Sequence, residues 1–181
     1  MRTGQSRRGR DGVDMVLYKP RMLIPIVLLV VACAGCDYAT KRAAQSLRGV
    51  PPVRLAGGCV MLTYAENRGA MLSVGAGLPE KARFLIFTVA VGALLLAVAV
   101  VLFFSREISP RLALALALMF AGGGCNLVDR LTHDGRVVDF VALSAGGLRT
   151  GIFNFADVYI LLGACVLIST AFPPRPRRAT T

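Results

Sequence analysis

The sequence predicts a mainly α-helical integral membrane protein with four membrane-spanning helices and a small strand platform outside the bilayer. Three observations carry this prediction: long uncharged apolar runs, basic residues gathered on one side of those runs, and two more polar segments on the other side. The chain has 181 residues, 55% of them apolar, and a mean hydropathy of +0.64. Soluble domains of this size carry more charge and shorter apolar runs.

The apolar runs are long enough to cross a bilayer, because roughly 20 helical residues span a hydrocarbon core of about 30 Å. Phe84–Phe104 holds 21 residues without a charge, Leu112–Val128 holds 17, and Gly151–Phe172 holds 22 with a single charge. Met22–Cys36 holds 15 uncharged residues and reaches spanning length only by continuing past Asp37. We therefore predict spans over about residues 22–41, 83–104, 112–130 and 152–172.

The charge distribution places both chain termini in the cytoplasm. Residues 1–21, the connector 105–111 and the tail 173–181 together hold eleven basic and three acidic residues, whereas the rest of the chain holds ten and seven. Basic residues accumulate on the cytoplasmic side, and four spans return the chain to the side on which it started. We predict a basic, disordered N-terminal segment over residues 1–20. A four-span domain follows over residues 21–172, with outer segments at 42–82 and 131–151. Residues 173–181 form a basic cytoplasmic tail.

Two other classes of protein fit the composition less well. The net charge of +11 could suit nucleic-acid binding, but no aromatic stacking platform accompanies the basic residues, so we predict no nucleic-acid partner. The five cysteines are odd in number and lie mostly in apolar runs. Cys33 and Cys36 form a C-x-x-C pair, but no second Cys or His pair completes a tetrahedral site, so helix packing by small residues is favoured over a metal site.

The N-terminal region also resembles the signal segment of a bacterial lipoprotein. Basic residues precede the apolar run Met22–Val31, and Cys33-Ala34-Gly35-Cys36 follows with Cys36 where a lipid would be attached. Such a chain would be a processed precursor. The three further apolar runs argue against this alternative, because exported lipoproteins are normally soluble beyond their anchor.

The first outer segment predicts a small platform of strands on the membrane surface. We expect the helix of the first span to end at Pro51-Pro52. Cys59–Ala65 then favours a short strand, Glu66–Gly69 a turn with Asn and Gly available for positive φ, and Ala70–Val74 a returning partner strand.

Ionisable and amide side chains near the outer ends of the spans mark a candidate site, because such groups are costly in a bilayer and usually face a functional interior. Asp139 lies in the apolar stretch Val137–Val141, which we expect at the interface. If the fourth helix starts near Phe153, Asp157 lies about 6 Å inside the boundary. The remaining polar groups fall at i, i+3 or i+4 spacing: Asp37 with Lys41, Asn126 with Asp129 or Arg130, and Asn154 with Asp157.

Two carboxyl groups brought together in a low-dielectric site tend to hold one proton between them. That state suits peptide hydrolysis, because the ionised member can activate water while the protonated member polarises the scissile carbonyl. His133 lies in a polar loop, and Ser73 and Ser144 have no evident basic partner. An alternative remains open, in which the acidic and amide residues pair with Arg130 and Arg136 only to hold helices together.

Four segments, in this order, resemble the signal peptidase II family, the lipoprotein signal peptidases of bacteria. Each one alone is weak, but four in order with the matching topology are specific, and with their apolar flanks they cover about residues 20–172. The segments are Asp37-Tyr38-Ala39-Thr40-Lys41, Asn67-Arg68-Gly69-Ala70-Met71, Gly122 to Arg130 followed by Val137-Val138-Asp139-Phe140, and Phe153-Asn154-Phe155-Ala156-Asp157.

The resemblance implies a four-span fold with an extracytoplasmic β-cradle and a short interfacial helix. It implies an aspartic endopeptidase whose catalytic residues are Asp139 and Asp157, supported structurally by Asp37 and Lys41. Neither a metal nor an organic cofactor is expected. The residues implied to bind substrate or shape the site are Asn67, Gly69, Asn126, Asp129, Arg130, Asn154 and Ala156.

The implied substrates are prolipoproteins that carry diacylglyceryl on a cysteine and are cut just before it. The resemblance also implies contacts with membrane lipids, inhibition by globomycin-type cyclic peptides, and a monomer in the bacterial cytoplasmic (inner) membrane with its active site at the outer leaflet. A lipid-anchored substrate presents its scissile bond just within the interface, where the carboxyl pair is expected.

The sequence departs from the family pattern at three places, none of which removes a proposed catalytic group. Cys125 stands where Gly is usual, Met71 replaces Phe, and one additional residue near His133-Asp134 predicts a bulged loop before Asp139. Two alternatives remain open. One is a non-catalytic scaffold or small transporter with Asp129 and Arg130 as a structural ion pair, and the other is an aspartyl peptidase that cuts unlipidated helices.

Overall fold

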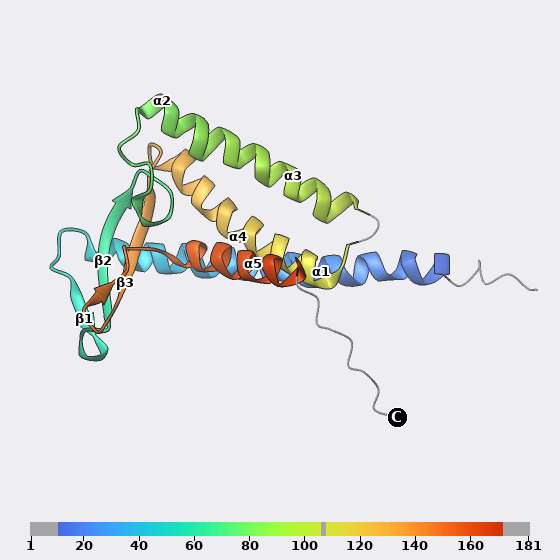
Figure 1. Ribbon diagram of the computed structural model, residues 1–181, viewed down its shortest axis with the longest axis horizontal. Coiled ribbons are helices and arrows are strands. Elements are labelled where there is room, and N and C mark those ends of the chain that lie inside the picture. The colour runs from blue at the N-terminus through green and yellow to red at the C-terminus, as the bar shows by residue number, and fades with distance from the viewer. Residues whose placement is uncertain (1–10, 106–107, 172–181) are drawn as a thin grey trace, which may run out of the picture.

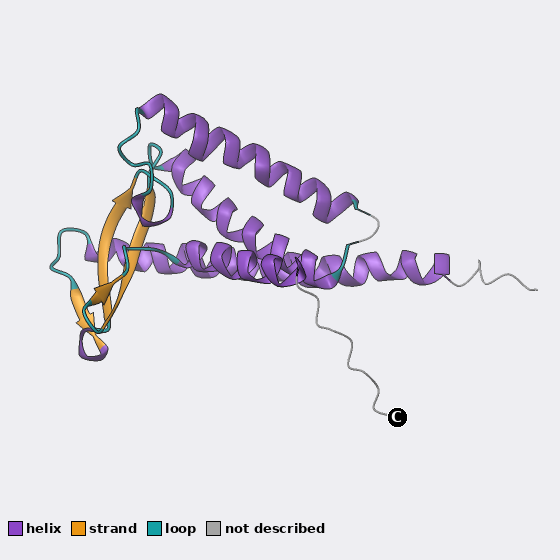
Figure 2. Cartoon of the chain, viewed as in Figure 1, coloured by secondary structure: helices purple, strands orange, loops and turns teal. Residues whose placement is uncertain are grey.

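Four long helical segments extend from a small β-sheet at one end of the molecule (Figures 1 and 2). The computed structural model describes residues 11–105 and 108–171, with side chains from Met22 onward. The second segment is continuous but composite, because a π-helical stretch, η5, separates α2 from α3. The elements are α1 (Asp11–Ala44), α2 (Glu80–Arg83), η5 (Phe84–Ala90), α3 (Val91–Phe104), α4 (Pro110–Thr132) and α5 (Phe155–Ala171).

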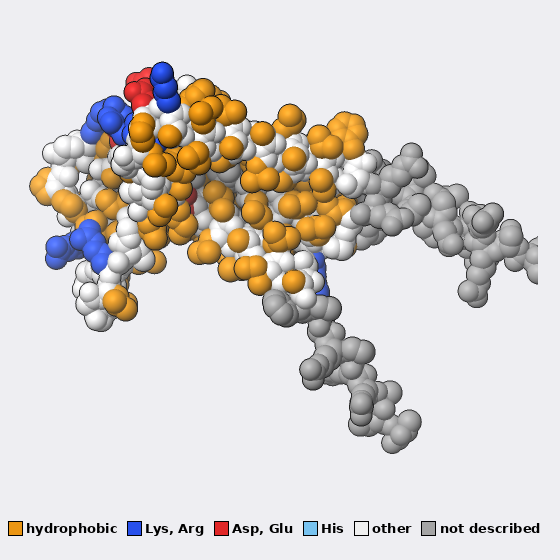
Figure 3. Space-filling model, turned by 45° about the horizontal axis from the view of Figure 1, so that its top comes forward, with side chains coloured by type: hydrophobic (Ala, Val, Ile, Leu, Met, Phe, Trp, Pro, Cys, Tyr) orange, Lys and Arg blue, Asp and Glu red, His pale blue; other side chains and the backbone are white. Residues whose placement is uncertain are grey.

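Three of these segments are long and apolar enough to cross a membrane: Met22–Leu47, Glu80–Phe104 and Pro110–Thr132. The fourth, α5, is apolar but has only 17 described residues, so the count of four spans stays a prediction. Figure 3 shows hydrophobic side chains along the helices and charged ones near the sheet and the start of α2. The predicted class, a mainly helical membrane protein with a small sheet, is confirmed.

The boundaries of α1 differ from the prediction at both ends. The helix begins at Asp11, inside the segment predicted to be disordered, while residues 1–10 and the basic tail 173–181 lie outside the described chain. The expectation that Pro51-Pro52 would end the helix is wrong. α1 ends at Ala44 and passes through the 3₁₀ turn η2 (Gln45–Leu47) to Gly49, whose φ of +74° favours glycine.

The sheet is antiparallel, with the strands in the order β1-β2-β3-β4. The predicted strand Cys59–Ala65 is confirmed from Val60 onward as most of β2, but Glu66 and Asn67, predicted to begin a turn, continue the strand. Val137–Val141 forms part of its neighbour β3. The strand bounds are Val53–Leu55 for β1, Val60–Asn67 for β2, Val137–Ala145 for β3 and Leu148–Arg149 for β4.

The prediction that Ala70–Val74 returns as a strand beside β2 is wrong. This segment closes on itself through a bond from the Ala70 N–H to the Val74 carbonyl at 2.8 Å. Leu72 and Ser73 adopt φ of 59° and 62°, which a strand does not allow. The short helical elements of the outer segments are three-residue 3₁₀ turns: η2, η3 (Ala56–Gly58) and η4 (Met71–Ser73).

Two features of the fold bring the start of α5 to the sheet and to α4. Phe153 exchanges backbone hydrogen bonds with Val141 at 2.8 and 3.0 Å, so the chain leaves the edge of β3 directly into α5. Glycines then let α4 and α5 pack closely. A Cβ atom at Gly122 would collide with the Ala156 carbonyl, and one at Gly163 would lie 2.7 Å from the Ala115 carbonyl oxygen.

Candidate active site

Asp157 lies in the first turn of α5 and is held there by a reciprocal cap. The Asn154 side-chain oxygen accepts from the Asp157 N–H at 2.9 Å, and the Asn154 N–H donates to an Asp157 carboxylate oxygen at 3.4 Å. This exchange satisfies two donors at the helix terminus. The helix begins at Phe155 rather than near Phe153, so Asp157 lies two residues, about 3 Å, along it instead of the predicted four.

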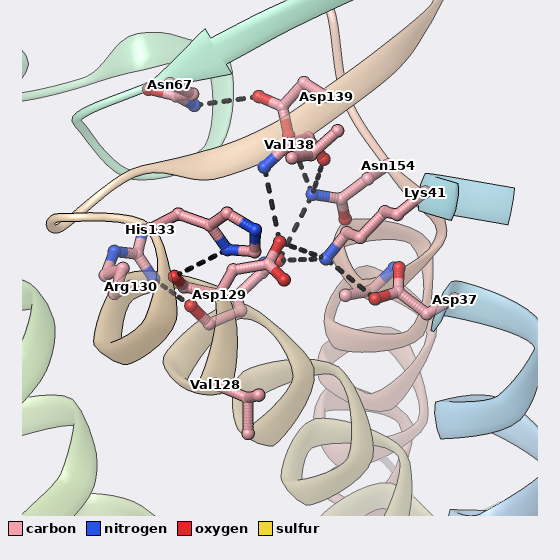
Figure 4. Close-up of polar contacts among 12 residues, drawn as sticks. Asp37, Lys41, Asn67, Val128, Asp129, Arg130, His133, Val138, Asp139 and Asn154 are labelled. Carbon is pink, nitrogen blue, oxygen red and sulfur yellow. Dashed lines mark hydrogen bonds and ion pairs between the residues drawn. The ribbon is translucent and has the colours of Figure 1, made fainter. Parts of the chain in front are cut away.

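Asp139 comes from β3, and its side chain is almost completely buried. One carboxylate oxygen accepts from the Asn67 amide at 3.0 Å, and the other accepts from the Asn154 amide at 2.7 Å (Figure 4). The strand register explains the first contact, because Ala65 of β2 pairs with Asp139 and Asn67 lies two residues further along. Both oxygens are therefore held by amides from other elements.

Asn126 connects Asp157 to the rest of the polar cluster. Its amide nitrogen donates to the second Asp157 carboxylate oxygen at 2.9 Å, and its amide oxygen accepts from the Asn154 amide at 3.1 Å. All four side chains are buried. The structure thus links Asp139 and Asp157 through Asn154 and orients each carboxylate with a further asparagine.

The electrostatics of Asp139 follow from this burial. Removal from water disfavours its ionised form, and the negative charge of Asp157 acts in the same direction; together they raise the pKa of Asp139 to about 7. The amides of Asn67 and Asn154 oppose the shift, because they donate to the ionised carboxylate. A carboxyl group whose pKa is raised toward neutrality can both hold and release a proton near neutral pH, which is a condition for acid–base work.

Lys41 supports the cluster from α1. Its ammonium group lies 2.7 Å from the Asp37 carboxylate, as predicted from their spacing, and 2.8 Å from that of Asp129. It also donates to the Asn126 amide oxygen at 3.2 Å. Asp37 in turn accepts from the Ala156 N–H of α5 at 2.9 Å. Lys41 therefore ties the start of α5 and the end of α4 to α1 (Figure 4).

Arg130 connects α4 to the turn that follows β2. Its guanidinium donates to the carbonyl of Gly69 at 2.8 Å and to that of Asn126 at 3.3 Å, and it lies 5.6 Å from the Phe87 ring centre. Gly69 is fixed by its own N–H, which donates to the Asn67 side chain at 2.8 Å. The buried Arg130 Nε has no hydrogen-bond partner within the part of the chain that the structure describes.

Arg130 and Arg136 do not form ion pairs with Asp139 or Asp157, as they would if these acidic residues served only to hold helices together. The hydrogen bonds of Arg130 go to backbone carbonyls, and Arg136 forms its ion pair with Glu66 of β2 at 2.6 Å. Nor do Asp129 and Arg130 form the ion pair on which the scaffold alternative relied, because the partner of Asp129 is Lys41.

Several contacts could not be anticipated from residue type. Backbone N–H groups are the main examples: Val138 donates to Asp129 at 3.2 Å, and Ala156 donates to Asp37. Phe87 lies in the π-helical stretch, and nothing in the sequence around it indicates that its ring would pack against Arg130.

His133 is exposed, with Nδ1 3.1 Å from the Asp129 carbonyl. A tight turn follows it, in which Asp134 and Gly135 adopt φ of 51° and 75°; the bulge relative to the family pattern stays a prediction.

Comparison with known proteins gives a consistent result. A family model described as Signal peptidase (SPase) II matches residues 29–172. A lipoprotein signal peptidase of Chlorobium phaeobacteroides is 34% identical over 157 residues, covering 80% of this chain and 90% of that protein. One from Streptococcus thermophilus is 35% identical over 154 residues, covering 82% and 91%. A solved bacterial membrane enzyme has the same fold, with a TM-score of 0.68 at 22% identity over 83% of this chain and 94% of that one.

Proposed function

The chain belongs to the signal peptidase II family of aspartic peptidases, and from this premise we propose that it cuts diacylglyceryl-modified prolipoproteins just before the lipidated cysteine. The reaction uses water activated by Asp139 and Asp157. The observation that carries the proposal is their shared partner: Asn154 donates its side-chain amide to Asp139 and its backbone N–H to Asp157.

In this mechanism the carboxyl pair holds one proton. We assign that proton to Asp139, whose pKa is raised to about 7 by burial and by the neighbouring charge. Asp157 then carries the negative charge, which the N-terminal end of α5 favours through its aligned peptide dipoles. The ionised group takes a proton from water as it attacks, and the protonated group donates to the carbonyl oxygen of the scissile bond.

The surrounding residues position these groups. Asn67, Asn126 and Asn154 each donate to a carboxylate oxygen, so the two carboxyl groups cannot rotate freely. Asp129 and Lys41, with Asp37, hold α1, α4 and α5 together behind them. Such support matters because displacing a reacting group by about 1 Å can cost a hundredfold in rate.

The position of the pair suits a lipid-anchored substrate. Asp157 lies in the first turn of an apolar helix and Asp139 in the sheet next to it, so the pair sits where the helical and sheet regions meet. Next to Asn67 and Gly69, exposed apolar side chains of Met71, Leu72 and Val74 offer a surface for the substrate. We propose that this end faces the outer leaflet of the bacterial cytoplasmic membrane, that both termini are cytoplasmic, and that the enzyme works as a monomer sensitive to globomycin-type peptides.

The test is a gel-shift assay of a lipidated precursor with purified enzyme in detergent. Asp139→Asn and Asp157→Asn should each abolish the shift while the proteins remain inserted and folded. Asp134→Asn is the matched control, because Asp134 is an exposed acid in the turn before β3. If either dyad variant processed the precursor at near wild-type rate, the mechanism would be refuted. Equal cutting of lipidated and unlipidated precursor would refute the substrate assignment.

A further inference from the structure

The ammonium group of Lys41 reaches the catalytic cluster from α1. Its side chain is buried and lies between Asp37 and Asp129 (Figure 4). An ammonium group has three hydrogens and no lone pair, so it can only donate. Lys41 has one acceptor for each hydrogen: a carboxylate oxygen of Asp37 at 2.7 Å, one of Asp129 at 2.8 Å, and the amide oxygen of Asn126 at 3.2 Å. Its third hydrogen is therefore committed to Asn126.

The side-chain amide of Asn126 has an accepting end and a donating end, and Lys41 selects the end that faces it. Because Lys41 can only donate, the amide oxygen turns toward it, and the amide nitrogen turns toward Asp157, to which it donates at 2.9 Å. In the opposite orientation the nitrogen would face an ammonium group and the oxygen would face a carboxylate, and both contacts would be repulsive. Donation therefore runs in one direction, from Lys41 through Asn126 to Asp157.

Asn154 also donates to the Asn126 oxygen, at 3.1 Å, but it does not fix that oxygen alone. Its amide nitrogen carries two hydrogens and lies near three acceptors: a carboxylate oxygen of Asp139 at 2.7 Å, the Asn126 oxygen, and the Val138 carbonyl at 3.2 Å. The shortest contact goes to the carboxylate, as expected for a charged acceptor. One hydrogen remains for the other two acceptors together, so the Asn126 oxygen depends on Lys41.

We propose that Lys41 is a positioning residue for the peptidase reaction, because it fixes the amide orientation of Asn126 and thereby supplies Asp157 with a hydrogen-bond donor. That donor favours the ionised form of Asp157 and holds its carboxylate in place for the attack of water. This role rests on the proposed function. It is separate from the support that Lys41 gives to α4 and α5 through its two carboxylate partners, since it acts through the third hydrogen alone.

The experiment is a double-mutant cycle on kcat for a lipidated precursor, with the full-length enzyme in detergent. Lys41→Met and Asn126→Leu should each lower kcat by about tenfold to a hundredfold, the effect of one hydrogen bond to a charged group. KM should hardly change, because both side chains are buried. The double variant should be no slower than Asn126→Leu, because Lys41 acts through that amide. Losses that multiply in the double variant would overturn the proposal.

A charge-balanced pair of variants separates this role from an effect of Lys41 on folding. Wild type has one ammonium group against two carboxylates, a net charge of −1, and Lys41→Met combined with Asp129→Asn keeps the single charge of Asp37. The reference is Asp129→Asn alone, in which Lys41 still donates to Asn126. Relative to this reference, the combined variant should lose at least about tenfold in kcat. Equal kcat in the two would show that Lys41 is only structural. Arg42→Met, at the exposed next position, should retain the wild-type kcat.

The role of Lys41 and the peptidase mechanism can fail separately. If Asp157→Asn retained cleavage, the mechanism would be wrong, and the role of Lys41 would be wrong with it. If Asp157→Asn abolished cleavage while the losses from Lys41→Met and Asn126→Leu multiplied, the mechanism would stand and only the role of Lys41 would be rejected. The cycle is therefore measured on the same precursor and in the same detergent as the variants of the two aspartates.

Discussion

The side-chain amide of Asn154 donates to the carboxylate of Asp139 at 2.7 Å, while the oxygen of the same side chain caps the helix that carries Asp157. One residue therefore sets both the start of α5 and the relative position of two carboxyl groups from different elements. Because its side chain is fully buried, a change at this position affects helix capping and carboxylate orientation together. Substitutions can separate these two roles.

Asn154→Ala should lower both stability and cleavage. Loss of the cap costs about 1 kcal/mol, with a range of about 0.5–2 kcal/mol. Asn154→Ser retains a hydroxyl oxygen that can cap the helix but lacks the amide that donates to Asp139. We expect Asn154→Ser to unfold near the wild-type temperature and yet to cleave slowly, with the loss in kcat rather than in KM. Thermal unfolding and initial cleavage rates check this, and recovery of full activity by Asn154→Ser would show that the amide is dispensable.

Lys41→Met should destabilise the protein strongly. The substitution preserves much of the side-chain volume but leaves the buried carboxylate of Asp37 and the partly buried carboxylate of Asp129 without a counter-charge. Removing one partner of a buried ion pair typically costs about 3–5 kcal/mol. The neighbouring Arg42→Met is the control, since an exposed side chain usually changes stability by less than about 0.5 kcal/mol. Unfolding in lipid-free detergent measures both, and equal effects would contradict the assigned role of Lys41.

The pKa of Asp139 predicts a pH dependence with a definite sign. Its folded-state pKa of about 7 lies above the ordinary value of 3.8, so the folded protein binds this proton more tightly than the unfolded chain does. The stabilising contribution is full below about pH 4 and is lost as the pH rises through 7. Cleavage should decline over the upper part of the same window, because the pair then loses its shared proton.

Asp139→Asn provides the control for this pH dependence. The amide is neutral at every pH, so unfolding temperatures of this variant should vary less between pH 4 and 7 than those of wild type. If the two proteins showed the same variation, Asp139 would not be the group that titrates.

Gly122→Ala should destabilise the contact between α4 and α5. The added methyl group would collide with the Ala156 carbonyl, next to Asp157, and overpacking of this kind costs about 1–3 kcal/mol. Gly124→Ala is a matched control on the same helix, because its methyl group would lie in open space. Thermal unfolding should separate the two variants, and cleavage should fall only in Gly122→Ala. A tolerated Gly122→Ala would show that the helices can move apart without cost.

The predictability of the fold from the sequence differed between elements. Apolar length located the second, third and fourth helical segments to within about three residues, because the requirement for a span depends on local composition. It did not locate the start of α1, which begins at Asp11, eleven residues before the predicted span. The partner of β2 was predicted wrongly as Ala70–Val74, since alternation identifies a strand but not the strand with which it pairs. Val137–Ala145 pairs with residues that lie 70 to 83 positions earlier in the chain and became the partner only through folding. The start of α5 was misplaced by two residues, because Phe153 is held by β3.

By itself, the sequence determined the class of the protein, three apolar helices long enough to cross a membrane, the pairing of Asp37 with Lys41, and a short set of polar residues from which a family resemblance followed. These depend on hydropathy, on helical spacing and on local motifs, all of which act within a few residues. Tertiary structure alone decided that Asp129 pairs with Lys41 rather than Arg130, and that Asn154 lies between Asp139 and Asp157. A buried charge or amide takes the partner that packing brings within about 3 Å, and no local pattern specifies that partner.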